Sequence, residues 1–201
     1  MPDLVIRPLI YVVDDDHDLA CSLARMLIRT GYHAEPFVDP AQLLVAYDAA
    51  PAACVITDVM MGEMDGFAFA ERLRVIDPAT AFVFMTAWPT TTHAVDAIRR
   101  HGGVDYLEKP VDLERLLAAV GESVAWSTHR RSQLVRTARL SPREREVFRL
   151  LVKGLSNKAI AAELGLSPKT VEDHRAQIAA KTGTNGLAQL MTLVETNAFP
   201  V

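Results

Sequence analysis

The stretch IYVVDDD at positions 10–16 decides how the first part of this sequence is interpreted, because four apolar residues stop at three acids. The run at 54–57 stops in the same way at Asp58, and the run at 81–85 stops at Thr86. Short, continuously apolar runs are typical of strands that are covered on both faces of a sheet. The pattern therefore predicts buried strands, each followed by a polar residue.

Helical patterns occupy the intervals between these strands. Strands are predicted at residues 10–13, 33–37, 54–57, 81–85 and 104–107, and helices at about 19–31, from Asp39-Pro40, from Gly66 to Ile76, at 94–100 and after Asp112. Five strands that alternate with helices predict an α/β fold, a doubly wound parallel sheet with helices on both faces.

Polar side chains follow four of the five strands. In open α/β sheets the functional site lies outside the carboxyl ends of the strands. Three carboxylates at one edge repel each other unless a cation lies among them, and hard oxygen ligands suit Mg²⁺. A lysine there can balance the charge of a phosphoryl group, and a threonine can donate a hydrogen bond to it. The residues concerned are Asp14, Asp15, Asp58, Thr86 and Lys109.

Residues 8–125 resemble a response-regulator receiver domain. The resemblance rests on Val13-Asp14-Asp15, Thr57-Asp58, Met64-Asp65-Gly66, Thr86-Ala87 and Tyr106-Leu107-Glu108-Lys109-Pro110. It implies a five-stranded parallel sheet in the order 2-1-3-4-5 with five helices. It also implies a sensor histidine kinase as the partner that supplies a phosphoryl group.

The same resemblance assigns roles to the residues at the strand ends. Asp58 would be the phosphoacceptor. Asp15 and Asp58 would bind Mg²⁺ together with the backbone carbonyl of Met60, and Asp14 would assist through water.

Three further residues would bind the phosphoryl group or change position in response to it. Lys109 would hold its oxygens, and Thr86 and Tyr106 would form the switch pair. In this family the bond between Lys109 and Pro110 is often cis. One departure is visible, since glycine stands at position 62 where the family usually has proline.

Charge divides the chain into two parts. Residues 1–125 hold 19 acidic against 9 basic side chains, a net charge of −10, whereas residues 126–201 hold 6 against 12, a net charge of +6. An acidic domain joined to a basic one suggests that only the second faces a polyanion. Residues 126–138 would be either a helical extension or a mobile linker between a 1–125 domain and a 139–201 domain.

The start of the chain lacks the pattern of a signal peptide, and no apolar stretch approaches the ~20 residues that span a bilayer. The sequence therefore predicts a cytoplasmic protein that does not contact a membrane.

Beyond residue 139 only helices are predicted. The capping box at 141–144 starts a helix that ends at Gly154, Ser156 starts a second, Ser167-Pro168 caps a third over 169–181, and a fourth spans about 186–195. Two short helices joined at 164–167 suggest a helix-turn-helix. A small helical interaction domain is the alternative that the pattern leaves open.

Residues 139–195 resemble a LuxR-type DNA-binding domain. The resemblance rests on residues 140–147, 154–161 and 167–172. A receiver followed by this domain is similar to the FixJ branch of response regulators. The resemblance implies operator DNA and RNA polymerase as partners, and a homodimer on phosphorylation.

Helical geometry predicts which residues of the third helix, the recognition helix, face DNA. At 100° per residue, Val171, His174, Ile178 and Thr182 share one arc and should face the core. The DNA-binding candidates are Lys169, Glu172, Asp173 and Ala176 on the opposite arc, Thr170 and Arg175 at its flanks, and Lys158 on the preceding helix. Acids on a groove face repel phosphate and can favour only a donor such as cytosine N4.

One enzymatic alternative uses the same strand ends. It is a Mg²⁺-dependent phosphohydrolase with Asp58 as an aspartyl nucleophile. That class needs a cap or a substrate pocket, and the first domain contains no insertion long enough for a cap. The sequence therefore predicts a transcription regulator that is not an enzyme.

Overall fold

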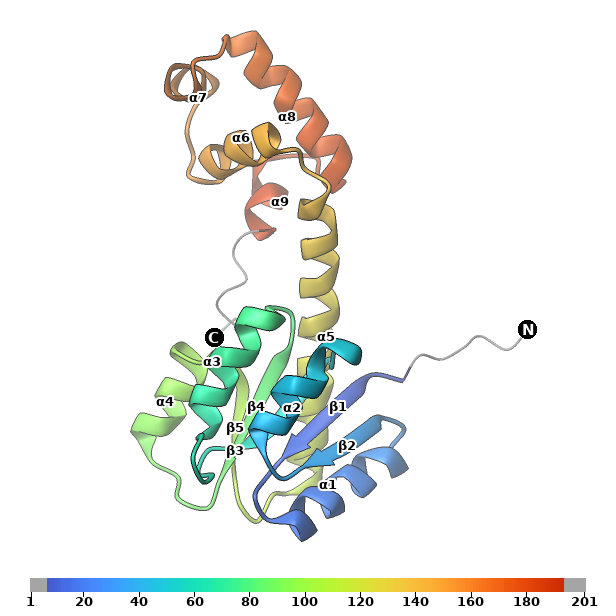
Figure 1. Ribbon diagram of the computed structural model, residues 1–201. Helices are drawn as coiled ribbons and strands as arrows, with labels where there is room; N and C mark the ends of the chain where they lie inside the picture. Colours follow the sequence, from blue (N-terminus) through green and yellow to red (C-terminus); the bar gives the residue numbers. More distant parts are fainter. Residues whose placement is uncertain (1–6, 194–201) are drawn as a thin grey trace, which may run out of the picture. The chain divides into compact units, whose positions relative to one another are not determined.

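The computed structural model describes residues 7–193, which form two compact units that divide between His129 and Arg130 (Figure 1). Within the described residues, no helix is both long enough and apolar enough to cross a membrane.

The first unit is built on a five-stranded parallel sheet in the order β2-β1-β3-β4-β5. The strands are β1 (Leu9–Val13), β2 (His33–Phe37), β3 (Cys54–Asp58), β4 (Ala81–Thr86) and β5 (Gly103–Glu108). The predicted fold class and strand order are confirmed, with β1, β3, β4 and β5 each slightly longer than their sequence patterns indicated.

Helices follow each strand and cover both faces of the sheet (Figure 1). They are α1 (His17–Arg29), α2 (Pro40–Ala46), α3 (Gly66–Ile76), α4 (Thr91–Arg99) and α5 (Leu113–Ala138), with a 3₁₀ turn, η1, at Tyr47–Ala49. The side chains of Asp16, Asp39, Asp65 and Thr90 cap the first four helices by accepting hydrogen bonds from backbone N–H groups. The 3₁₀ turn has no periodic signal and was not predicted.

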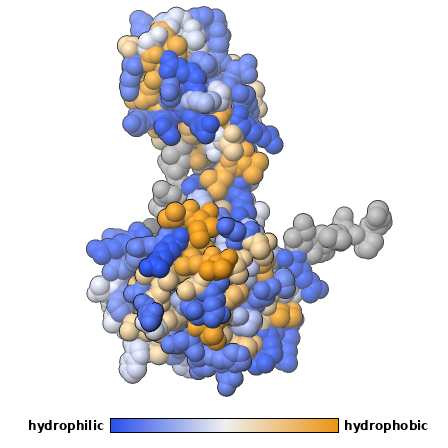
Figure 2. All heavy atoms as spheres, viewed as in Figure 1, coloured by the Kyte–Doolittle hydropathy of each residue, from blue (hydrophilic) through white to orange (hydrophobic). Residues whose placement is uncertain are grey.

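Alternate residues of β1 serve opposite layers of the core. Ile10 and Val12 pack with the residues of α1 and α5, whereas Tyr11 and Val13 pack with those of α2 and α3. On the outside, apolar side chains gather over α2 and α3 (Figure 2), where Val45 is exposed. The inner strands are apolar on both sides because helices cover both faces.

The second unit consists of helices in its described residues. They are α6 (Pro142–Val152), α7 (Asn157–Leu164), α8 (Pro168–Thr182) and α9 (Leu187–Thr192). The predicted capping box is complete: Glu144 N–H donates to the Ser141 hydroxyl, and the Glu144 carboxylate accepts from Ser141 N–H. The fourth helix was predicted to reach residue 195, and residues 194–195 lie outside the described residues.

Helix α5 contains the whole of the segment at 126–138. Its last turns pack within the second unit, where Gln133 Nε2 donates a 2.8 Å hydrogen bond to the Thr192 carbonyl. Arg136 Nε donates a 2.5 Å bond to the Thr182 carbonyl at the end of α8. The segment is helical, and its portion from Arg130 onward belongs to the second unit.

Candidate functional site

Three acids meet where the strands of the first unit end. β1 and β3 are parallel neighbours with Val13 opposite Thr57, so Asp14 and Asp58 follow at the same level. Carboxylate oxygens of Asp14, Asp15 and Asp58 lie within 4.8 Å of one another. Asp14 and Asp58 are buried, whereas Asp15 is exposed.

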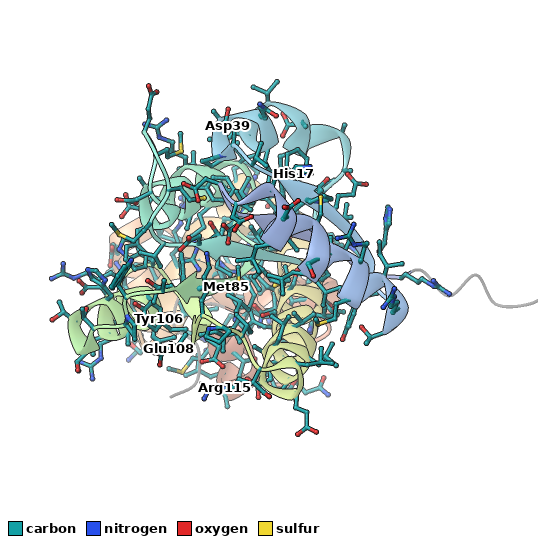
Figure 3. All side chains as sticks on the ribbon, turned by 90° about the horizontal axis from the view of Figure 1, so that it is seen from below. His17, Asp39, Met85, Tyr106, Glu108 and Arg115 are labelled. Atoms are coloured by element: carbon teal, nitrogen blue, oxygen red, sulfur yellow. The ribbon has the colours of Figure 1, made fainter. Side chains whose placement is uncertain are left out.

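Figure 3 views the first unit from the side on which the strands end. Met85 of β4 lies near the centre of this view. Asp39 and His17 lie to one side of it, and Tyr106 and Glu108 lie to the other. The labelled residues thus come from both halves of the sheet.

Lys109 supplies the positive charge of this site. Its Nζ lies 2.6 Å from Asp58 Oδ2, with hydrogen-bond geometry, and 2.6 Å from Asp14 Oδ2 as an ion pair. Asp14 Oδ2 accepts no hydrogen bond of good geometry from the described residues. The Lys109-Pro110 peptide bond is cis.

The pKa values of Asp14 and Lys109 are both raised, but for different reasons. Burial raises the pKa of Asp14, and the nearby Lys109 only partly opposes this effect. Burial lowers the pKa of Lys109, but its contacts with Asp14 and Asp58 outweigh that cost, and the pKa is raised. The lysine is therefore held charged. The three carboxylate oxygens are the hard ligands that Mg²⁺ prefers, so the residues present fit that ion.

The loop after β3 fixes the other oxygen of Asp58. Met60 N–H donates a 3.1 Å hydrogen bond to Asp58 Oδ1. A Cβ on Gly66 would lie 2.1 Å from the Asp58 backbone carbonyl oxygen, so only glycine fits there. In the sequence, Gly66 stood out only as part of the motif Met64-Asp65-Gly66. Its close approach to the Asp58 carbonyl becomes visible only in the folded chain.

The predicted switch pair lies on neighbouring strands. Tyr106 of β5 stands opposite Phe84, two residues before Thr86 on β4. The Thr86 hydroxyl is buried and accepts a 3.1 Å bond from Trp88 N–H, so its own hydrogen remains available to donate. The Tyr106 hydroxyl is buried and has no hydrogen-bond partner among the described residues.

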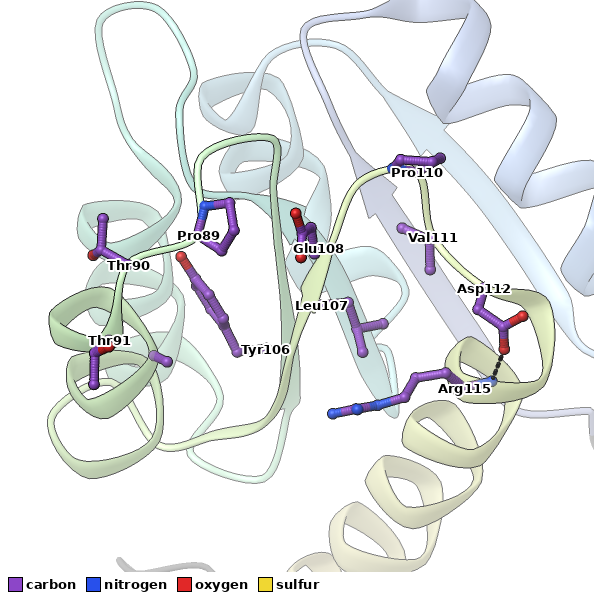
Figure 4. A pocket seen from close by; sticks show the side chains of 11 residues that line it. Pro89, Thr90, Thr91, Tyr106, Leu107, Glu108, Pro110, Val111, Asp112 and Arg115 are labelled. Carbon is purple, nitrogen blue, oxygen red and sulfur yellow. Dashed lines mark hydrogen bonds between the residues drawn. The ribbon is translucent and has the colours of Figure 1, made fainter.

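Beside Tyr106 lies a hollow of about 780 Å³ that is lined by residues of α4, β5 and the start of α5. Figure 4 shows the hydroxyl end of Tyr106 beside Pro89, with Thr90 nearby. On the far side, Arg115 pairs with Asp105 at 3.0 Å. Tyr106 therefore borders an open volume next to the loop at Pro89.

In the second unit, the predicted orientation of α8 is observed. Val171, Ile178 and Thr182 are buried, and His174 is half-buried. The groove-facing candidates Lys169, Glu172, Asp173 and Ala176 are exposed, as is Lys158 on α7, whereas Thr170 and Arg175 are half-buried.

The charges on this face are paired with each other. Lys169 Nζ lies 3.4 Å from Glu172 Oε2 and 3.4 Å from Asp173 Oδ1. Attraction by Asp173 and Glu172 raises the pKa of Lys169. Arg175 Nη1 donates a 2.7 Å bond to Asn157 Oδ1 at the start of α7, so Arg175 ties the two helices of the helix-turn-helix together.

A salt bridge joins α6 to the end of α8. Lys181 Nζ donates 2.7 Å hydrogen bonds to both carboxylate oxygens of buried Glu144. These bonds and the Ser141 N–H lower the pKa of Glu144. Sequence reasoning missed this pair, because 37 residues separate the partners and no periodic pattern links them.

Two family descriptions match the chain. Residues 10–121 match the response regulator receiver domain, and residues 138–194 match the bacterial regulatory proteins of the luxR family.

Other proteins are similar over most of the length of this chain. The transcriptional regulatory protein FixJ of Bradyrhizobium diazoefficiens is 36% identical over 92% of this chain and 93% of its own length. The tetrathionate response regulatory protein TtrR of Salmonella typhimurium is 32% identical over 95% of this chain and 94% of its own. The crystal structure of full-length FixJ from B. japonicum superposes with a TM-score of 0.56 at 35% identity, covering 92% of this chain and 95% of that one.

Proposed function

The chain belongs to the two-component response regulators that join a receiver domain to a LuxR-type DNA-binding domain, and we propose that phosphorylation of Asp58 controls its DNA binding. Such a regulator implies a histidine kinase partner and binds DNA. The phosphohydrolase alternative receives no support from the matching families. DNA binding also favours the cytoplasm, where a bacterial chromosome lies.

The contact between Lys109 and Asp58 carries this proposal. Asp58 ends the central strand, its Oδ1 is bonded to Met60 N–H, and its Oδ2 faces the Lys109 ammonium. In the transfer, a carboxylate oxygen of Asp58 forms a bond to phosphorus while the phosphorus–nitrogen bond of a kinase phosphohistidine breaks. Lys109 would then balance the charge of the phosphoryl oxygens.

Receiver domains generally bind Mg²⁺ at their acidic pocket. Here the ion would be held by Asp15 and Asp58, with the Met60 carbonyl as a third ligand and Asp14 acting through water. Bound Mg²⁺ supplies positive charge that offsets the charge of the phosphoryl oxygens. Asp14 would act through water, because its carboxylate is buried in the same cluster as Asp15 and Asp58.

The switch would act through Thr86 and Tyr106. The Thr86 hydroxyl would donate to the phosphoryl group, and Tyr106 would turn inward as the loop at Pro89 follows. This movement would reshape the hollow between α4 and β5, the face through which we propose that the receiver dimerises. A dimer presents two recognition helices to half-sites one DNA turn apart, about 34 Å. Contact with RNA polymerase would follow at the promoter.

Phosphoryl incorporation from acetyl phosphate with Mg²⁺ tests the acceptor. The full chain should be labelled, and Asp58→Asn should not be. Asp65→Asn is the matched control, since Asp65 caps α3 outside the cluster, and it should label like wild type. Equal labelling of the Asp58→Asn variant would show that another residue is the acceptor.

Sedimentation of the same samples tests the dimer. The unmodified chain should sediment as a monomer, and the phosphorylated chain as a dimer. An identical mass in both states would contradict phosphorylation-dependent dimerisation while leaving the acceptor assignment intact.

A further inference from the structure

The second unit contains a groove of about 430 Å³ that neither the receiver chemistry nor the recognition helix uses. It runs between the last turns of α5, the outer flank of α6 and the residue after α9. Its floor is apolar, and three guanidinium groups stand at its rim. The floor includes Leu134, Leu140, Phe148 and Leu193, and the rim includes Arg130, Arg145 and Arg149.

Two of the rim arginines carry charge that the described residues do not balance. Arg145 and Arg149 are exposed and four positions apart on α6. In the described part of the chain, neither side chain has an ion pair or a hydrogen bond. Like charges at this spacing destabilise a helix, so an acidic partner would relieve a cost that the unit otherwise carries.

Several other cations of the same unit are paired with acids. Arg143 pairs with Glu146, and Lys181 pairs with Glu144. Lys153 and Lys158 of this unit are also exposed and have no ion pair among the described residues, but they do not line the groove. What distinguishes the groove is that its two unpaired arginines border apolar side chains.

The groove lies on the flank of α6 that faces away from α7. Arg143 Nη2 donates to the Leu164 carbonyl at the end of α7. Arg145 is two residues further on, which places it about 200° around the helix from Arg143. The exposed arc of α8, with Lys169 and Glu172, belongs to the helix-turn-helix that α7 completes. The groove is thus separate from the face that reads DNA.

We propose that this groove binds an acidic, amphipathic helix of a partner protein. Carboxylates of the partner would pair with Arg145 and Arg149, and its apolar side chains would fill the floor beside Leu134 and Phe148. DNA offers phosphates to the arginines but no apolar side chains for the floor, so a peptide fits the groove better. The proposal does not depend on phosphorylation of Asp58.

A designed peptide tests the charge requirement directly. The probe is a fluorescent helical peptide with Glu four residues apart on one side and Leu on the adjoining face, titrated into the full chain by anisotropy. Arg145→Gln with Arg149→Gln should weaken binding roughly five- to tenfold, because two exposed ion pairs are lost. The same peptide with Lys in place of Glu should bind neither chain.

The matched control removes two exposed charges elsewhere. Lys153→Gln with Lys158→Gln should leave peptide binding unchanged and weaken binding to random duplex DNA, since Lys158 lies on α7. The groove variant should show the reverse pattern. Leu134→Asn, which keeps both arginines, should also weaken peptide binding. Circular dichroism checks that each variant is folded.

Three results would overturn the proposal. One is equal peptide affinity for the groove variant and the control variant. Another is a loss of DNA binding in the groove variant as large as in the control, which would make the groove a DNA contact. The third is peptide binding only to a chain shortened after Leu193, which would assign the groove to the chain's own last eight residues.

Discussion

The ammonium of Lys109 lies 2.6 Å from Oδ2 of Asp58, although 51 positions separate the two residues in the sequence. Their strands, β5 and β3, are not neighbours, because β4 lies between them. The contact exists because parallel strands deliver their following residues to one edge. It leaves the cluster of three acids and one lysine with a formal charge of −2, which a divalent cation would balance.

Replacing Asp15 should weaken Mg²⁺ binding at least tenfold, by analogy with losses at metal sites, because one anionic ligand is lost. In the absence of Mg²⁺, Asp15→Ala should not destabilise the fold, since carboxylate repulsion falls. Asp18→Asn, an exposed acid three positions away, is the control. Calorimetry or the fluorescence of exposed Trp88 measures both affinities. Unchanged Mg²⁺ affinity in Asp15→Ala would remove Asp15 from the ligand set.

The lifetime of the aspartyl phosphate should depend on Trp88 and Met60. These side chains are 73% and 56% exposed, two positions beyond Thr86 and Asp58. There they should hinder the water that attacks the phosphoryl group. Phosphate release should accelerate several-fold in Trp88→Ala and in Met60→Asn, and should not change in the control Val95→Ala. Unchanged release in both variants would mean that the two side chains do not occlude the site.

Glu144 should make the second unit sensitive to acid. Its folded-state pKa is held below the ordinary 4.5 by Lys181 and by Ser141 N–H. Its stabilising contribution is therefore complete above the unfolded pKa and is lost as the pH falls through the folded value. Glu144→Gln should lower the free energy of unfolding at pH 7 by about 1–2 kcal/mol, because the charged hydrogen bonds with Lys181 are lost, whereas the Gln carbonyl can still accept from Ser141 N–H.

Denaturant unfolding of the full chain from pH 7 to pH 3 measures this contribution. The variant should lose less stability on acidification than the wild type does. Glu146→Gln, which removes an exposed acid from the same helix, is the control. If the Glu144 variant and the wild type lose the same free energy of unfolding between pH 7 and pH 3, the salt bridge to Lys181 does not contribute to stability.

Removing the two acids of the recognition helix should raise binding to random DNA and reduce preference for the operator. In the structure Lys169 is paired with Glu172 and Asp173, so Glu172→Gln with Asp173→Val releases the lysine and removes phosphate repulsion. Any selective contact with cytosine is lost at the same time. Gel shifts across a salt series, on random DNA and on an operator found by footprinting, measure both effects. An equal loss of binding to every sequence would mean that the acids position the helix.

The strand ends could be predicted from the local sequence pattern, but the hydrogen bonds between residues far apart in the sequence could not. Apolar runs that stop at Asp14, Asp58 and Thr86 predicted the site, because a strand covered on both faces leaves a clear signal. The order of the strands came only with the receiver resemblance. The bond between Arg136 and Thr182 depends on how α5 packs against α8, and no periodicity records it. For the same reason the segment at 126–138 could not be assigned to helix or mobile linker.

Two glycines that follow β3, Gly62 in the loop and Gly66 at the start of α3, differ in how freely they can be replaced. A side chain at position 66 would collide with the carbonyl oxygen of Asp58, whereas a Cβ at position 62 would meet no atom within 4 Å. In a random library selected for function, position 62 should therefore accept many residues, and position 66 should return glycine alone. The backbone of the site thus prevents substitution at position 66, whereas four residues earlier, at position 62, it places no steric limit on the side chain.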